Sequence, residues 1–127
     1  MKIKMRFFGS LFMTLGILLG ALASHYFKKI LNPESLSSFE VGLRYLIYNA
    51  LGMLILSDVD FIKSKIKKII FYLIFWGTIF FSGSIFILSF KSLISFSLVW
   101  LGPITPLGGV SFIIGWILIT LTFVIKK

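Results

Sequence analysis

The side chains whose types and spacing suit chemistry gather in the hydrophobic segment 39–56. Glu40 and Arg44 stand four residues apart, so on an α-helix they lie one turn apart on one face and can form an ion pair. Tyr48 follows one turn later. A carboxylate beside a guanidinium in a membrane suits an ion pathway, a substrate-binding pair or a structural contact. The candidate intramembrane polar cluster comprises His25, Glu40, Arg44, Tyr45, Tyr48 and Asn49.

The helix expected over this segment has two unlike halves. The polar half contains Gly42, Arg44, Tyr45, Tyr48, Asn49 and Gly52, whereas the apolar half contains Leu43, Leu46, Ile47, Ala50 and Leu54. Because charged groups are expensive in hydrocarbon, we expect the polar half to face other protein or trapped water. The apolar half, Leu46 included, is then expected to face lipid.

The composition of the chain identifies the solvent that surrounds this helix. Of the 127 residues, 58% are hydrophobic and only 13% are charged, which is far too apolar for a soluble domain of this size. The chain has room for about four spanning helices of roughly 20 residues each. We therefore predict one all-α domain, residues 1–127: a multi-pass integral membrane protein whose four helices, at about 7–26, 38–57, 69–90 and 105–125, form a compact bundle.

The same composition excludes several kinds of function. There is no cysteine and only one histidine, His25, so we expect no metal site. No phosphate-binding loop, nucleotide-binding glycine pattern or serine-nucleophile elbow is present, so we expect no cofactor, no catalytic residue and no enzymatic activity. The net charge of +9 comes from basic residues that flank hydrophobic segments, which is typical of membrane proteins and argues against nucleic-acid binding. The expected partners are the lipid bilayer and either a second copy or another membrane protein.

Two interpretations compete for the first hydrophobic segment. The basic start and the run that ends in Ala21-Leu22-Ala23 are typical of a cleaved secretory signal. The run is longer than a usual signal core, however, and we favour a retained helix. It also contains Gly16, Gly20 and Ser24 at four-residue spacing, which allows a neighbouring helix to approach closely. In the last helix, Gly108, Ser111 and Gly115 predict a similar packing side.

The helix starts leave some alternatives open. Asn32 followed by Pro33 is a typical helix start, but Ser37 with Glu40 three residues later forms a second possible capping box. Thr105 followed by Pro106 predicts the start of the last helix. The apolar stretch 93–101 is too short to span; it either extends the third helix or lies at the interface, with Trp100 at headgroup depth.

The distribution of Lys and Arg predicts the orientation of the chain. With both termini inside, the cytoplasmic side holds nine basic residues and the outer side four, when Arg44 is counted at the entrance of the second helix. Positive charge favours the cytoplasmic side, so both termini are expected there.

Four blocks of the sequence resemble the YgdD-like family of small bacterial inner-membrane proteins, which is similar to an animal protein called transmembrane protein two-five-six. The blocks are GALASH (20–25), FEVGLRYLIYNAL (39–51), FSGSIFIL (81–88) and LGPITPLGGVSFIIGW (101–116). The resemblance implies a four-helix protein of the bacterial plasma membrane with a retained first helix. It implies no activity, because the family has no known biochemical function. Where the family usually has a histidine this chain has Asn49, and an amide cannot carry a proton at physiological pH.

Three functions fit these observations. A structural or interaction component of the membrane is favoured, because buried polar residues often set how helices pack and pair. A small transporter or ion pathway that uses Glu40 and Arg44 is the alternative. An enzyme would need a nucleophile and a base in the bundle, and His25, Tyr45, Tyr48 and Ser82 are too generic to indicate one.

Overall fold

The computed structural model describes residues 1–126, and all the regular secondary structure in this part is helical. Four of its helical segments are long and apolar enough to cross a membrane: Lys2–Ile30, Pro33–Ser57, Ser64–Ser89 and Val99–Lys126. The chain is therefore a multi-pass membrane protein with an all-helical fold. Lys127, one of the nine basic residues expected on the cytoplasmic side, lies outside the described part.

The four segments contain π-helical and 3-10 turns. The first comprises α1 (Lys2–Leu22), the π-helical η1 (Ala23–Phe27) and α2 (Lys28–Ile30). The second is α3 (Pro33–Ser57). The third comprises α4 (Ser64–Thr78), the π-helical η2 (Ile79–Gly83) and α5 (Ser84–Ser89). The short 3-10 turns η3 (Lys91–Leu93) and η4 (Val99–Leu101) precede α6 (Ile104–Lys126).

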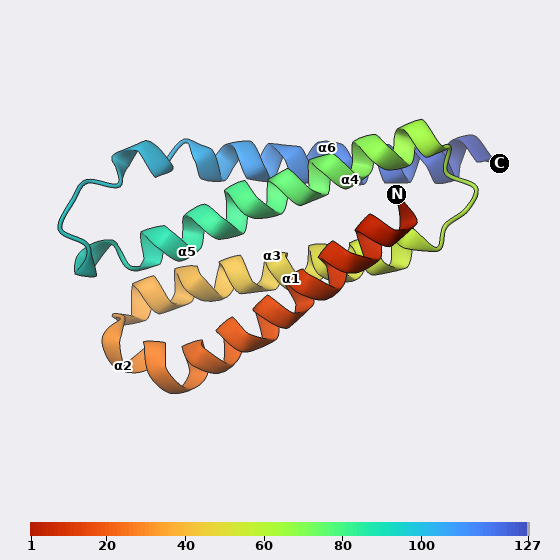
Figure 1. The fold of residues 1–127 in the computed structure, drawn as a ribbon. Helices are drawn as coiled ribbons and strands as arrows, with labels where there is room; N and C mark the ends of the chain where they lie inside the picture. Colours follow the sequence, from red (N-terminus) through yellow and green to blue (C-terminus); the bar gives the residue numbers. More distant parts are fainter. Residues whose placement is uncertain (127) are drawn as a thin grey trace.

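Successive segments run in opposite directions and form two hairpins (Figure 1). One hairpin pairs α1 with α3, and the other pairs α4 and α5 with α6. The beginning of α1 and the end of α6 lie at the same end of the molecule, next to the loop between α3 and α4. Lys2 forms an ion pair with Asp58 of that loop at 2.9 Å, and the Lys126 ammonium lies 3.8 Å from the centre of the Phe61 ring. We refer to this end of the molecule as the basic end.

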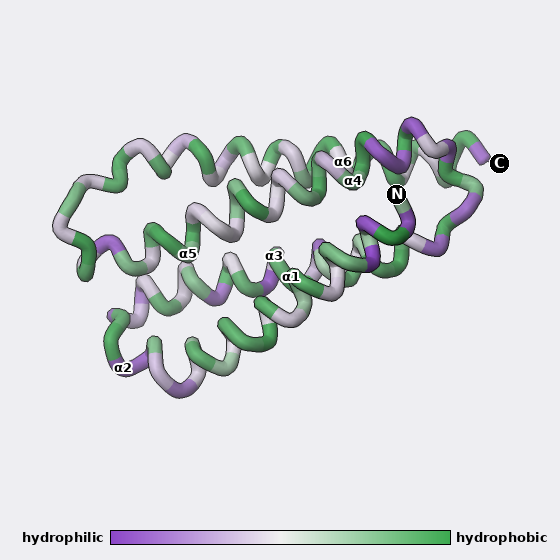
Figure 2. The backbone as a smooth tube through the Cα atoms, viewed as in Figure 1, coloured by the Kyte–Doolittle hydropathy of each residue, from purple (hydrophilic) through white to green (hydrophobic). Residues whose placement is uncertain are grey.

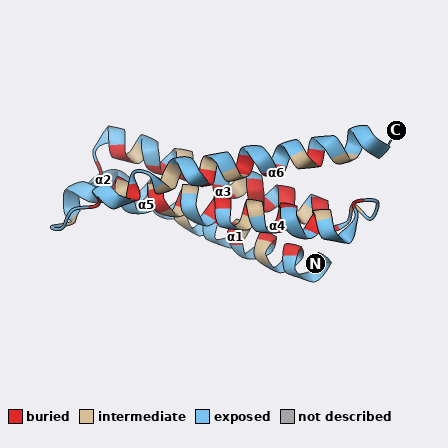
Figure 3. Ribbon diagram, turned by 90° about the horizontal axis from the view of Figure 1, so that it is seen from above, coloured by how far each residue is buried: buried red, intermediate tan, exposed pale blue. Residues whose placement is uncertain are grey.

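Helix α3 belongs to the first hairpin and also packs against α4, η2 and α5 of the second. Its Ala50, Met53 and Leu46 are buried against α1 and α4, in a core that includes Phe12 and Ile74. The buried residues line the sides on which the helices face one another, as Figure 3 shows, and the outward sides are exposed. The outward sides are nevertheless largely apolar, and polar residues concentrate near the ends of the bundle (Figure 2). This distribution suits a protein whose surroundings are hydrocarbon.

The first and third helices begin about five residues earlier than the sequence predicted. The first starts at Lys2 instead of residue 7, because Lys, Met and Arg favour the helix and the added turn brings Lys2 and Arg6 to Asp58. The third starts at Ser64 instead of residue 69. Its lysine-rich first turn is helical, and the ammonium of Lys67 is buried and donates to the Ser57 carbonyl at 3.0 Å. That bond satisfies one of the free carbonyls at the end of α3.

The second helix starts at Pro33, with Asn32 as its N-cap. The Asn32 side-chain oxygen accepts from the Ser35 amide at 2.8 Å. Ser37 therefore lies inside α3, and the alternative capping box of Ser37 and Glu40 is wrong.

Helix α6 begins one residue before Thr105, so Thr105 is not its N-cap. The Thr105 hydroxyl instead hydrogen-bonds to the Ser84 hydroxyl and links α6 to α5. The stretch before α6 does not extend the third segment, since residues 94–98 have no helical structure. Leu98 and Leu101 are buried, whereas Phe96 is 67% and Trp100 62% exposed, which suits a loop in the headgroup region.

The N-terminal helix contributes to the core. Met5 is fully buried and Phe12 is 6% exposed, and both belong to the main buried cluster. Phe12 stacks on Phe75 of α4 with ring centres 5.7 Å apart. Cleavage after Ala23 would remove these contacts, so the packing supports a retained first helix.

Candidate functional site

The charged residues of α3 do not face the interior of the bundle. Glu40, Arg44 and Tyr48 are all exposed, and Tyr48 keeps 56% of its surface accessible. Within residues 1–126, no ion pair joins Glu40 to Arg44 at the 4.0 Å limit. These three side chains therefore do not pack against other helices of this chain, whereas Gly42, Asn49 and Gly52 of the same polar half are buried. We refer to the exposed stripe of Glu40, Arg44 and Tyr48 as the charged face of α3.

Close packing with α1 explains why Leu46 and Ala50, in the apolar half of α3, are buried. Leu46 is 4% exposed, so it does not face lipid as the sequence analysis expected. Gly9 and Gly16 of α1 bring the two helices together, because a Cβ atom at Gly16 would lie 2.8 Å from Ile47 Cγ1. At Gly9 it would lie 3.1 Å from the Ala50 carbonyl oxygen. Such an approach leaves no room for a charged side chain.

Asn49 is the one polar side chain of the candidate cluster that is fully enclosed. It is 2% exposed; its amide nitrogen donates to the Tyr45 carbonyl at 2.8 Å, and its oxygen accepts from the Trp116 indole at 3.2 Å. Gly52 makes room for this indole, since a Cβ there would lie 2.9 Å from Trp116 Cζ2. Asn49 thus links α3 to α6 through a neutral hydrogen bond. Asn49 and Trp116 are 67 residues apart in the sequence, and no sequence pattern predicted that they pair.

Tyr45 lies at the border between the charged face and this link. It is 41% exposed, and its ring stacks on Phe112 of α6 at 6.2 Å and meets Phe81 edge-on at 4.9 Å. Its ring also contacts Tyr48 at 5.9 Å. An aromatic surface therefore flanks Arg44 on the side toward α6.

His25 lies apart from these residues. It belongs to the π-helical turn η1 and is exposed, and no hydrogen bond or ion pair joins it to another side chain in the described part of the chain. No three His, Cys, Asp or Glu side chains among residues 1–126 come close enough to hold a metal ion. The polar cluster of the sequence analysis is thus three separate features: an exposed face, an enclosed link and an isolated imidazole.

The small residues chosen as packing positions differ in what surrounds them. On α6, a Cβ at Gly108 would lie 2.8 Å from the Gly77 carbonyl oxygen, and one at Gly115 would lie 3.4 Å from Ile74 Cγ1. The Ser111 hydroxyl donates to the Leu73 carbonyl of α4 at 2.6 Å. On α1 only Gly16 makes the expected close contact. Gly20 has no atom within 4 Å of its Cβ position and Ser24 is exposed, because this end of α1 diverges from its neighbour (Figure 1).

A hydrogen bond from a serine hydroxyl to a backbone carbonyl also joins the two hairpins. Ser82, in the π-helical turn η2, donates to the Gly42 carbonyl of α3 at 2.8 Å. The two segments approach closely here, because a Cβ on Gly42 would lie 2.8 Å from the Phe86 ring. Such bonds from small hydroxyl residues are common between membrane helices.

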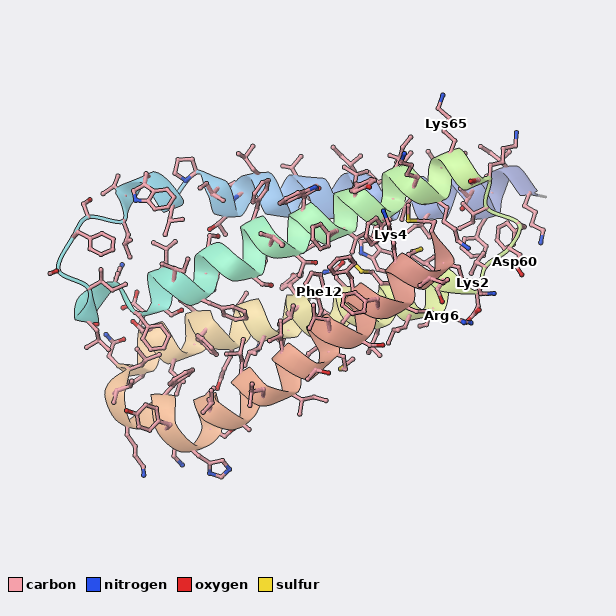
Figure 4. All side chains as sticks on the ribbon, in the orientation of Figure 1. Lys2, Lys4, Arg6, Phe12, Asp60 and Lys65 are labelled. Atoms are coloured by element: carbon pink, nitrogen blue, oxygen red, sulfur yellow. The ribbon has the colours of Figure 1, made fainter. Side chains whose placement is uncertain are left out.

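Electrostatic contacts cluster at the basic end, which Figure 4 shows with its labelled side chains. The Arg6 guanidinium lies 2.6 Å from Asp58, and Lys2 lies 2.9 Å from the same carboxylate. The hydrogen bond from Lys2 is the largest cause of a lowered pKa at Asp58, and Arg6 lowers the pKa further. This carboxylate therefore stays ionised below its ordinary range and ties the start of α1 to the loop after α3.

A cleft of about 320 Å³ opens at the opposite end, between the start of α3 and the segment from α5 to α6. Its lining residues are Asn32, Glu34, Ser35, Ser38, Ile85, Leu88, Ser89, Lys91 and Thr105. Neither Glu40 nor Arg44 lines it. The cleft therefore does not lead to the charged face of α3.

Comparisons with known proteins identify relatives that are described as membrane proteins. Residues 19–109 match a family described as a protein of unknown function (DUF423). The chain is 36% identical over 121 residues to the UPF0382 membrane protein YwdK of Bacillus subtilis, which covers 91% of this chain and 92% of the relative. A UPF0382 membrane protein of Staphylococcus aureus is 38% identical over 100 residues, or 79% of this chain and 78% of the relative. The UPF0382 inner membrane protein YgdD of Escherichia coli is 29% identical over 109 residues, or 80% and 75%. No solved structure matches the chain.

Proposed function

This chain belongs to the DUF423 family of membrane proteins of unknown function, and we propose that it acts as a structural or interaction component of the bacterial plasma membrane, with no enzymatic activity. In this proposal two copies associate within the membrane through the charged face of α3. The observation that supports it is the exposure of Glu40 and Arg44 on a helix that spans the membrane.

The depth of these two residues makes their exposure costly. Helix α3 has 25 residues, from Pro33 to Ser57, and its Ile47 contacts Gly16, the middle residue of the first segment, Lys2–Ile30. Arg44 is one turn from this middle level, and Glu40 is two turns from it. A charged side chain near the centre of a spanning helix costs about 2.5–3.5 kcal/mol in lipid. Contact with protein would offset that cost.

A second copy has the complementary chemistry. Two copies in one membrane have the same orientation, so a two-fold axis along the membrane normal places their α3 helices parallel. Residues of equal number then lie at the same depth, so each Glu40 reaches Arg44 of the other copy diagonally, across one helical turn, in two symmetric contacts. Tyr45 and Tyr48 supply aromatic surface beside the ion pairs, which is typical of protein interfaces.

A transport function has less support. It requires a water-filled path to the charged pair, whereas the 320 Å³ cleft is lined by neither residue. Asn49, the enclosed polar residue, is engaged in two hydrogen bonds and does not titrate. The charged face is open on the outside of the bundle, which favours association over conduction.

Cysteine cross-linking tests the proposal directly, because the natural chain contains no cysteine. We expect Tyr48→Cys to form a disulfide-linked dimer when membranes are treated with an oxidant. Ile17→Cys is the matched control: it is 64% exposed on α1, and the neighbouring Gly16 contacts Ile47, which places it at a similar depth. A dimer with Ile17→Cys as strong as that with Tyr48→Cys would indicate random collision and contradict the proposal, as would the absence of any dimer.

We also propose that both termini are cytoplasmic, as the charge distribution predicts. The basic end holds the start of α1, the loop between α3 and α4, and the end of α6, so these three parts share one side of the membrane. Reporter fusions after Lys29, Lys65 and Lys127 are expected to report outside, inside and inside. An outside signal after Lys65 would reverse the orientation.

A further inference from the structure

We propose that a groove at the basic end binds an anionic phospholipid, with its phosphate between α1 and α4 and one acyl chain along α4. This inference concerns a different surface from the charged face of α3 and does not depend on association of two copies. Two adjoining hollows support it, one basic and one apolar.

The basic hollow lies between the first turns of α1 and α4 and has a volume of about 610 Å³. Lys4 lines it from α1, while Lys65 and Lys68 line it from α4. All three are exposed, and Figure 4 shows Lys4 and Lys65 at the same end of the molecule. Three ammonium groups around one hollow are a suitable environment for a phosphate diester.

These lysines are not neutralised within the described residues. The acidic groups at this end are Asp58 and Asp60, and the residues that pair with them are Lys2 and Arg6. Lys67 is also engaged, since it donates to the Ser57 carbonyl. No carboxylate in residues 1–126 lies within 4.0 Å of Lys4, Lys65 or Lys68, so their charge is available to a ligand.

An apolar hollow of about 400 Å³ continues from the basic one along α4 toward the middle of the membrane. The two hollows share Lys68 and Tyr72, and the apolar one is further lined by Ile69, Leu73, Trp76 and Ser111. From Lys68 to Trp76 the helix rises about 12 Å. The groove is therefore basic where a headgroup lies and apolar over the depth that an acyl chain occupies, which distinguishes a lipid from free phosphate.

Tyr72 stands at the junction of the two hollows. It is 38% exposed, and its position one turn after Lys68 places the ring below the lysine ammonium groups. Its hydroxyl can donate to a phosphate or glycerol oxygen while the ring covers the chain. Tyrosine at the boundary between headgroups and hydrocarbon is common in membrane proteins.

The test uses the full-length protein in a neutral detergent and measures bound lipid by native mass spectrometry. Phosphatidylglycerol, phosphatidylcholine and inorganic phosphate are the three probes. We expect phosphatidylglycerol to bind and the other two not to bind. Binding of inorganic phosphate equal to that of phosphatidylglycerol would overturn the lipid assignment. Equal binding of phosphatidylcholine would overturn the role of the lysines.

Variants identify the residues. Each lysine near a membrane surface contributes about fivefold to the affinity for anionic lipid, so Lys68→Gln should weaken phosphatidylglycerol binding about fivefold and the three substitutions Lys4→Gln, Lys65→Gln and Lys68→Gln together about 100-fold. Lys68→Arg should retain binding, which shows that the charge is what matters. Lys29→Gln removes the same charge at the opposite end and should have no effect. Equal weakening by Lys29→Gln and Lys68→Gln would mean that net charge, and not the groove, determines binding.

Discussion

Replacing Gly108 by alanine tests the packing of the second hairpin. The new Cβ would be directed at the backbone nitrogen of Phe81 in η2 and would lie 2.8 Å from both the Gly77 carbonyl oxygen and Phe81 Cβ. Carbon atoms normally pack at about 3.5–4.0 Å, so α6 must move away from α4 by about 1 Å. Two of these neighbours are backbone atoms, and the position of the third, Phe81 Cβ, is fixed by the backbone, so none of them can rotate away as the end of a side chain can.

The size of the effect follows from opposing contributions. Overpacking of a tight contact costs about 1–3 kcal/mol, and displacement of α6 also stretches the 2.6 Å bond from Ser111 to Leu73, whose loss costs about 1 kcal/mol. Alanine regains up to about 1 kcal/mol through its higher helix propensity. We expect Gly108→Ala to lower the free energy of unfolding by about 2 kcal/mol, the middle of the range that these contributions allow.

Gly20→Ala is the matched control, because nothing lies within 4 Å of its Cβ position. It should leave stability unchanged or raise it by up to about 1 kcal/mol. Gly16→Ala should fall between the two, since the atom it meets, Ile47 Cγ1, belongs to a side chain that can shift. The assay is unfolding in mixed micelles with rising dodecyl sulfate, followed by circular dichroism. Equal stability of Gly108→Ala and Gly20→Ala would refute the packing argument.

Three further predictions use the same unfolding assay. Leu46→Ala should lower the free energy of unfolding by about 2 kcal/mol because Leu46 is buried. Ile17→Ala, on the exposed side of α1, should change it by less than about 0.5 kcal/mol. A larger effect of Ile17→Ala than of Leu46→Ala would mean that Leu46 faces lipid. Trp116→Phe should cost about 1 kcal/mol, since it leaves the buried oxygen of Asn49 without its donor; an unchanged unfolding midpoint would mean that the bond is not formed. The contacts that lower the pKa of Asp58 stabilise the fold at neutral pH. This stabilisation should be lost as the pH falls through the pKa of Asp58 in the folded protein, which lies below the ordinary carboxyl range. Asp58→Asn should abolish this part of the pH dependence, and an acid unfolding profile identical to that of the natural chain would contradict the prediction.

The four helices were predictable because length and hydropathy alone identify segments that can span a bilayer. The helix ends were less predictable. Ser64 to Lys68 are too polar for a hydrophobic span, and the burial of Lys67 depends on a bond to Ser57 that forms only when α4 meets the end of α3. The cap at Asn32 was visible because its chemistry is local.

The sequence predicted the burial of α3 only in part: Gly42, Asn49 and Gly52 of its polar half are buried, and Leu43, Leu46 and Ala50 of its apolar half are buried as well. Its periodicity separates a polar half from an apolar half, but it does not say which half faces other helices, since lipid and the protein interior are both apolar. The close approach of Gly9 and Gly16 decides the matter by placing Leu46 and Ala50 against α1. Gly9 lies seven residues before Gly16 and thus on the same helix face, a signal that the sequence contained.

The link between Asn49 and Trp116 illustrates what a sequence of this kind does not reveal. Asn49 was identifiable as a polar residue in a spanning helix, but its partner lies on a helix with which α3 has little backbone contact. Only the relative placement of the two hairpins brings the indole to the amide. The same placement leaves Glu40 and Arg44 outside the bundle.

Association through the charged face of α3 is tested most directly by two complementary charge reversals. Glu40→Lys makes both charged positions of this face positive, and Arg44→Glu makes both negative. Each variant should repel its own kind, whereas a mixed pair restores two opposite-charge contacts. The measurement is co-purification of differently tagged copies from one membrane, with the amount of each inserted chain determined by immunoblot. If a charge reversal prevents insertion, Glu40→Gln and Arg44→Gln replace the reversals. Each of these variants should then associate more weakly with its own kind than the natural chain does. We expect copies of the natural chain to co-purify, each reversal to fail with itself, and the mixed pair to co-purify. Co-purification of each reversal with itself as efficiently as with the other would contradict the account.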